Sequence, residues 1–179
     1  MNENEKIHVH IRWMIRRDLS EVLESEGAKG WTEEDFLNEL RKRNVIGMVA
    51  ERGEKVIAHM IYELHKNHIL LTNICVNPNW RRKGIGRELV EKLKSKLSSS
   101  TYRHKLLVPI PEWNLDAQLF FKSQGFATSY IDREYYKDSN VEAYVLEFTL
   151  PVPEANVEEE WKELLNGTYL PENRIAHLL

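Results

Sequence analysis

The chain has 179 residues, a hydrophobic content of 42% and a formal net charge of −3. This length predicts one domain with a short appended segment, and the hydrophobic content is sufficient for a packed core. The slight negative charge argues against nucleic acid as the main partner, and a single cysteine excludes a disulfide framework.

The chain shows no sign of a membrane or metal partner. No apolar run reaches transmembrane length, and the polar start MNENEK is not typical of a signal peptide. His8 and His10 share one face of the first predicted strand, but no acidic or cysteine partner accompanies them, so we expect no metal site. We therefore expect a cytoplasmic protein.

The first part of the chain predicts one strand and two short helices. Residues 7–14 alternate in polarity, which is typical of a strand. Asp18 is expected to cap a helix that runs through about Glu26. Thr32 and Asp35 have the spacing of a capping box, which predicts the start of a second helix.

A three-stranded antiparallel meander is predicted next, because three apolar runs are joined by tight connections. The runs are residues 45–51, 55–64 and 68–76. The third run ends in Ile74, Cys75 and Val76. We expect Cys75 to act as a small buried hydrophobe, because the sequence places no base beside it that would activate a thiolate.

A basic turn containing two glycines connects this third strand to a strongly amphipathic helix, predicted over residues 84–97. The turn consists of Arg81, Arg82, Lys83, Gly84, Ile85 and Gly86. Glycine lets the backbone approach a ligand closely, and the first N–H groups of a helix have no intrahelical partner. The pattern therefore predicts a site for a di-anionic group such as a pyrophosphate. The alternative is a simple turn with solvated charges.

The remaining elements close the sheet. A fifth strand is predicted over residues 105–110, where Pro109 and Pro111 cannot donate to a neighbour, so pairing must stop on at least one side. Asn114 is expected to cap a helix that ends at Gly125. The last two predicted strands are residues 126–131 and 141–149.

The domain is predicted to end before Pro151 and Pro153, which gives one domain over residues 1–150. Residues 151–179 then form a tail that is partly compatible with a helix. This tail packs either on its own domain or on a second copy in a homodimer, and the sequence leaves both alternatives open.

Four stretches resemble the GCN5-related N-acetyltransferases (GNAT) and, within them, the branch that acetylates protein N-termini, of the ribosomal-protein-alanine type. In chain order they are the basic turn and residues 114–126, 133–136 and 141–146, and the likeness extends over about residues 7–150. The resemblance implies an α/β (α+β) fold. Its sheet is mixed, mostly antiparallel and seven-stranded, with a splay between the fourth and fifth strands and about four flanking helices.

The resemblance also implies a reaction, the transfer of an acetyl group from acetyl-CoA to a primary amine, in the first place a protein N-terminal amine. The residues implied to bind the coenzyme are Ile74, Cys75 and Val76 along its arm, Arg81, Arg82, Lys83, Gly84, Ile85 and Gly86 around its pyrophosphate, and Asn114 and Phe121 on the following helix. The segment between the first two strands is implied to form one wall of the acceptor site. A small-molecule amine as acceptor, and a non-catalytic module that binds acetyl-CoA or CoA, stay open as alternatives.

The sequence departs from the family at the two proton-transfer positions. The usual glutamate on the fifth strand is replaced by Leu107 or Pro109, and the usual tyrosine of the next helix is replaced by Phe121. The remaining candidates are Glu112, the nearest carboxylate along the chain, and Tyr136, in the stretch implied to line the acceptor site. An α-amino group has a pKa of about 8, so a fraction is neutral at pH 7 and the need for a strong base is reduced.

Overall fold

The computed structural model describes residues 9–26, 30–98, 103–136 and 140–151. The strands are β1 (His10–Trp13), β2 (Val45–Arg52), β3 (Lys55–Leu64), β4 (His68–Val76), β5 (Lys105–Pro111), β6 (Ala127–Asp132) and β7 (Ala143–Thr149). The helices are α1 (Leu19–Glu26), α2 (Glu33–Leu40), α3 (Ile85–Lys94) and α4 (Leu115–Ser123), with short 3-10 turns η1 (Arg16–Asp18) and η2 (Pro78–Trp80). The predicted tail helix lies outside the described residues, so the domain boundary at residue 150 stays a prediction.

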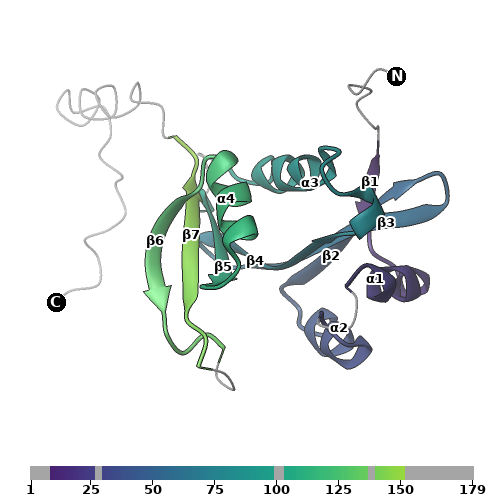
Figure 1. The fold of residues 1–179 in the computed structure, drawn as a ribbon, viewed down its shortest axis with the longest axis horizontal. Coiled ribbons are helices and arrows are strands. Elements are labelled where there is room, and N and C mark those ends of the chain that lie inside the picture. Colours follow the sequence, from purple (N-terminus) through teal and green to yellow (C-terminus); the bar gives the residue numbers. More distant parts are fainter. Residues whose placement is uncertain (1–8, 27–29, 99–102, 137–139, 152–179) are drawn as a thin grey trace, which may run out of the picture.

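The strands form one seven-stranded sheet in the order β1-β2-β3-β4-β5-β7-β6. All neighbours are antiparallel except β4 and β5, which run parallel, so the predicted fold class is confirmed. Helices α3 and α4 cover one face, and α1 and α2 cover the other (Figure 1). No helix in the described part of the chain combines the length and apolar character needed to cross a bilayer.

The predicted splay between β4 and β5 is present. The two strands pair only from His68 with Lys105 to Leu70 with Leu107, whereas β5 continues to pair with β7 as far as Pro111. Pro109 and Pro111 have no N–H to donate, and pairing stops on the β4 side of β5, where the strands part. The second half of β4 therefore pairs with β3 on one edge and has no β5 partner on the other.

A β-bulge in β4 lies at the point where the strands part. Ile61 of β3 pairs with Asn73, and Tyr62 pairs with Leu71, so Thr72 is the additional residue. Its hydroxyl donates to the Ile61 carbonyl over 3.1 Å. Because side chains alternate along a strand, the additional residue moves every later side chain to the opposite face. Asn73 consequently faces α1, although Leu71 packs in the core on the α3 side.

Helix α3 forms for the reasons that its sequence predicts. Its apolar stripe is fully buried against the sheet and consists of Ile85, Leu89, Val90 and Leu93. Lys92 and Lys94 lie in the last turn, where they complement the helix dipole. The helix begins after Gly84, whose backbone is left-handed. A Cβ added at Gly86 would lie 3.7 Å from the Val76 side chain, so the first turn of α3 lies beside the end of β4.

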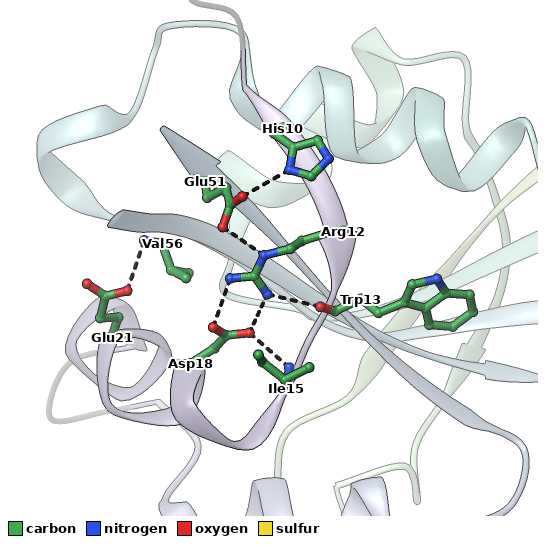
Figure 2. A network of polar contacts seen from close by, with 8 residues as sticks. All are labelled: His10, Arg12, Trp13, Ile15, Asp18, Glu21, Glu51 and Val56. Carbon is green, nitrogen blue, oxygen red and sulfur yellow. Dashed lines mark hydrogen bonds and ion pairs between the residues drawn. The ribbon is translucent and has the colours of Figure 1, made fainter. Parts of the chain in front are cut away.

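A polar network holds α1 against the first strands (Figure 2). The Arg12 guanidinium binds Asp18 in a fork with distances of 2.6 and 2.9 Å, and its Nε donates to Glu51 over 2.7 Å. The Asp18 carboxylate also accepts from the Ile15 N–H over 2.8 Å. The prediction that Asp18 caps the helix following it is therefore wrong, because this carboxylate reaches back to Arg12 and Ile15. The capping box of Thr32 with Asp35 is confirmed.

Candidate active site

The connection from β4 to α3 is held in a specific shape by its own side chains. The Arg81 Nε donates to the Val76 carbonyl over 2.9 Å, and the Asn77 side chain accepts from the Asn79 N–H. Arg82 has φ +61°, an unusual left-handed value for a residue with a side chain. The first hydrogen bond of α3 runs from the Glu88 N–H to the Gly84 carbonyl. The three preceding amides of the helix therefore have no carbonyl within it to which they can donate.

Gly84 and Gly86 are glycines for different reasons. Gly84 has φ +84°, and a Cβ added there would meet no atom within 4 Å, so its surroundings have room for a ligand. At Gly86 an added Cβ would lie 3.3 Å from the Phe120 ring and 3.7 Å from the Val76 side chain. The structure thus gives Gly86 a packing role between α3 and α4, whereas Gly84 shapes the open part of the turn.

The three basic side chains of the turn are exposed, but two of them already have protein partners. Arg81 is bound to the β4 carbonyl described above. The Lys83 ammonium lies 4.9 Å from the centre of the Trp80 ring, and the Arg52 guanidinium lies 5.2 Å from the same centre. These contacts place positive charge around the start of α3, where the helix dipole also favours an anion.

The end of β4 provides the edge along which the coenzyme arm is predicted to lie. Ile74 and Val76 pack toward the core under α3, and Cys75 faces α1. The Cys75 thiol is partly buried and donates to the Ser25 carbonyl over 3.2 Å. Burial raises the pKa of this thiol to about 11, so it is protonated at neutral pH and is not a nucleophile there.

Asn114 and Phe121 differ in how accessible they are to a ligand. The Asn114 side chain caps α4 by accepting from the Ala117 N–H over 3.2 Å, which confirms its predicted capping role. Phe121 is 2% exposed, and its ring packs edge-on against Phe120 and Phe126. The predicted contacts of both residues with the coenzyme stay predictions.

The two candidate proton-transfer residues, Glu112 and Tyr136, differ in their exposure. The Glu112 side chain is exposed, while its backbone N–H donates to Glu142 and its carbonyl accepts from Gln118. Tyr136 is half-buried, and burial raises its pKa to about 12. Its phenol is therefore protonated at neutral pH and can donate a proton.

Tyr135 lies beside Tyr136 in the connection after β6. Its ring meets that of Tyr136 edge-on, with centres 4.9 Å apart. Its pKa is raised by burial and by nearby groups, among them Tyr136, Glu63 of β3 and Glu39 of α2. Tyr135 therefore lies close enough to β3 and α2 to be influenced by their carboxylates.

Sequence reasoning missed a buried polar cluster on the α1 side of the sheet, which joins Glu26, His59 and Asn73. The His59 Nε2 lies 2.8 Å from the Glu26 carboxylate, and His59 is 0% exposed. The available signal was a histidine inside the otherwise apolar run of residues 56–62. Within the described ranges, no group of three or more potential ligand side chains is arranged to hold a metal ion.

Taken together, the splayed parallel pair, the unpaired edge of β4 and the amides at the start of α3 are the features of an acyltransferase fold. The sequence matches the profile of the acetyltransferase (GNAT) family over residues 12–126, and the chain belongs to that family.

Curated relatives come from the protein N-terminal branch. The [ribosomal protein bS18]-alanine N-acetyltransferase of Escherichia coli K12 is 27% identical over 122 residues, which covers 68% of this chain and 81% of that protein. The Salmonella typhimurium enzyme of the same name is 25% identical with the same coverage.

Solved structures share the fold. The E. coli ribosomal-protein-S18-alanine N-acetyltransferase superimposes with a TM-score of 0.70 at 24% identity, covering 84% of this chain and 99% of that one. Naa20 of Chaetomium thermophilum, solved with a bisubstrate analogue, superimposes with a TM-score of 0.69 at 20% identity, and the match covers 83% of this chain and 90% of Naa20. A GNAT family acetyltransferase of Elizabethkingia anophelis with acetyl-CoA bound superimposes with a TM-score of 0.64 at 16% identity, and the match covers 82% of this chain and 100% of that one.

Proposed function

We propose that this protein transfers the acetyl group of acetyl-CoA to the N-terminal amine of a protein. The observation that carries the proposal is the unpaired edge of β4, which ends beside the left-handed Gly84 and the first amides of α3. This arrangement offers strand-like hydrogen bonds to an extended arm and N–H donors to its phosphates. The curated relatives, whose acceptor is a ribosomal protein alanine, support a protein N-terminus as acceptor.

The proposed roles of the residues follow from these positions. The backbone of Ile74 to Val76 aligns the coenzyme arm, and the turn from Arg81 to Gly86 holds the pyrophosphate. The Val76 N–H polarises the thioester carbonyl, as the resemblance implies. The neutral amine then attacks that carbon, the thiolate leaves, and the amine loses its proton. Holding both substrates in one groove supplies much of the rate acceleration.

The proton transfers are assigned to Glu112 and Tyr136. The structure places Leu107 and Pro109 in the ladder with β7 and Phe121 in the core, and none of these side chains can transfer a proton. Glu112 is exposed at the end of β5 and is proposed to accept the amine proton. Tyr136 is protonated at neutral pH and is proposed to donate to the departing thiolate.

The function is tested by following the release of free thiol from acetyl-CoA. The acceptors are peptides starting with Ala, Ser or Met, beside polyamines. We expect turnover on peptides and none on polyamines, because the acceptor groove is proposed to hold a peptide. Turnover only on polyamines would assign the protein to small-molecule acetylation.

A non-catalytic module is the second candidate function, and a specific observation favours it. The positions of the usual base and acid are occupied by side chains without titratable groups, as described above. Coenzyme binding measured by calorimetry, without thiol release on any acceptor, would establish this alternative.

Exchanging Glu112 for glutamine is expected to lower kcat at saturating acetyl-CoA by at least about tenfold, since positioned proton transfer contributes 10²–10⁴-fold. Tyr136→Phe is expected to lower kcat by a similar factor. Initial rates over a range of pH check both changes. Glu134→Gln, an exposed carboxylate near Tyr136, is the matched control and should keep kcat within about twofold. An unchanged kcat in Glu112→Gln would remove this carboxylate from the mechanism.

A further inference from the structure

Large apolar side chains are exposed along α4 and β6. Among the described residues, seven large apolar side chains are exposed, and five of them lie in these two elements or directly before α4. These five are Trp113, Leu115, Leu119, Tyr130 and Ile131. Exposed apolar side chains that gather in one region mark a surface that binds another segment or another molecule.

The exposed side chains of α4 form one stripe. Leu115, Leu119 and Lys122 follow each other at the spacing i, i+4 and i+7, so they lie along the same side of the helix. The neighbouring Phe120 faces α3, because its ring lies 3.3 Å from the position of a Cβ added at Gly86. Each helical residue is rotated by about 100° from the one before it, so the stripe is turned away from α3.

Ile131 of β6 faces the same side of the sheet as α4. It pairs with Tyr144 of β7, and residues directly opposite in an antiparallel pair share a face. Tyr144 packs against the core under α3 and α4. Strand β6 forms the border of the sheet, and α4 lies between it and α3 in the view of Figure 1. Leu115, Leu119 and Ile131 therefore border one exposed surface, the α4–β6 surface.

The sequence after the described residues carries a pattern that matches this surface. Val157, Trp161, Leu164 and Leu165 recur at the spacing i, i+4, i+7 and i+8, which predicts an amphipathic helix over residues 154–165. Twelve helical residues span about 18 Å. The six residues of β6 span about 20 Å, so the predicted helix has the length of the strand that it would cover.

The connection to this predicted helix is short and begins next to the surface. It follows β7, which lies beside β6 in the sheet, and Pro151 and Pro153 prevent β7 from continuing its ladder. A strand and a helix joined by so few residues run antiparallel to each other, with the helix on one face of the sheet. Residues 154–165 can thus return along β7 and β6 within the same chain.

Charge selects the face of the sheet that the helix covers. Residues 152–179 contain six glutamates and two basic residues, a net charge of −4, which leaves +1 for the rest of a chain whose total is −3. On the α4 side the stripe ends in the exposed Lys122, and the end of α4 lies near Phe148, where β7 ends. The opposite face of β7 presents the Glu147 carboxylate, which would repel an acidic segment.

From these observations we infer that residues 154–165 form a helix that docks on the α4–β6 surface of their own chain. The apolar side of the helix covers Leu115, Leu119 and Ile131, and its glutamates lie near Lys122 at the start. The docked helix adds a third helix to the face that α3 and α4 cover, over the border of the sheet. This inference is independent of the proposed reaction.

Limited proteolysis of the full chain tests the docking. Trypsin cleaves after Lys162, in the middle of the predicted helix, and a synthetic peptide of residues 152–170 contains the same single site. We expect cleavage at this bond to be at least about tenfold slower in the protein than in the peptide, because a protease cuts a docked segment only when it opens. Peptide mapping by mass spectrometry follows the rate.

Three variants locate the docking surface. Leu119→Asn and Ile131→Asn each remove an apolar contact from a different element, and each should speed cleavage after Lys162 at least about threefold. Ile15→Asn is the matched control, since Ile15 and Ile131 are both 47% exposed but Ile15 precedes α1. This control should leave the rate unchanged. Circular dichroism establishes that each variant is folded, and either surface variant alone carries the test.

The other outcomes each contradict the proposal. Cleavage as fast in the protein as in the peptide would overturn the docking. Slow cleavage that folded Leu119→Asn or Ile131→Asn leaves unchanged would place the segment on another surface. Equal acceleration in Ile15→Asn would show that the protection does not depend on the α4–β6 surface. Protection that rises with protein concentration, together with a dimer mass in light scattering, would assign the segment to a second copy.

Discussion

Replacement of Gly84 by glutamate is expected to lower the affinity for CoA by at least about a hundredfold. The residue has φ +84° at the start of α3, and the space where its Cβ would lie is open. A glutamate there places a carboxylate beside the amides that are proposed to hold the pyrophosphate. Loss of one or two charge-assisted hydrogen bonds, at about 1.5–3 kcal/mol each, corresponds to this factor. Isothermal titration with CoA measures it.

Gly53→Glu is the matched control for this change. Gly53 also has a left-handed backbone, with φ +66°, and an added Cβ would meet no atom within 4 Å. The backbone penalty and the added charge are therefore the same, but the change lies in the connection between β2 and β3. We expect CoA affinity within about threefold of the unmodified protein. Equal losses in the two variants would show that α3 does not hold the phosphates.

Replacement of Asp18 by alanine is expected to lower the free energy of unfolding by about 3 kcal/mol. Removal of one partner from a buried ion pair leaves the other uncompensated, which typically costs 3–5 kcal/mol. Asp18 is 3% exposed, and its carboxylate binds Arg12 in a fork and accepts from the Ile15 N–H (Figure 2). Urea denaturation followed by circular dichroism measures the change.

Asp35→Ala provides the comparison, because Asp35 also accepts a backbone N–H and a side-chain donor, both from Thr32. Asp35 is exposed, so its loss is expected to cost about 1 kcal/mol or less. If Asp18→Ala and Asp35→Ala lowered the free energy of unfolding by the same amount, burial would not explain the contribution of Asp18.

The Asp18 contribution also has a defined dependence on pH. The hydrogen bond from Arg12 is the largest cause that holds the pKa of Asp18 below its ordinary value. A depressed carboxyl pKa stabilises the folded state above the unfolded pKa of about 3.9 and loses this effect as pH falls through the folded pKa. The difference between the unmodified protein and Asp18→Ala should thus be constant from pH 7 to 5 and shrink below about pH 4.

Much of the proposed coenzyme site could be predicted from neighbouring residues in the sequence. The strand ending at Val76, the basic turn and the apolar stripe from Ile85 are contiguous, so local patterns report them directly. The antiparallel meander and the opening beside β5 agreed with expectation, since tight connections join the meander strands and Pro109 and Pro111 reveal where pairing stops. The packing of Gly86 against Phe120 was not predicted, because Phe120 lies 34 positions away in the sequence, on another helix.

The sequence by itself determined which segments form strands and helices, because hydrophobic periodicity, capping residues and glycine act over a few neighbouring residues. Only the tertiary structure decided which face Asn73 occupies. That face depends on the bulge at Thr72, which is defined by pairing with β3 and leaves no local pattern. The tertiary structure also brought Glu26 and His59 together, although they lie 33 positions apart in the sequence. Packing of α1 on the sheet removes both side chains from water, and their pairing then becomes necessary.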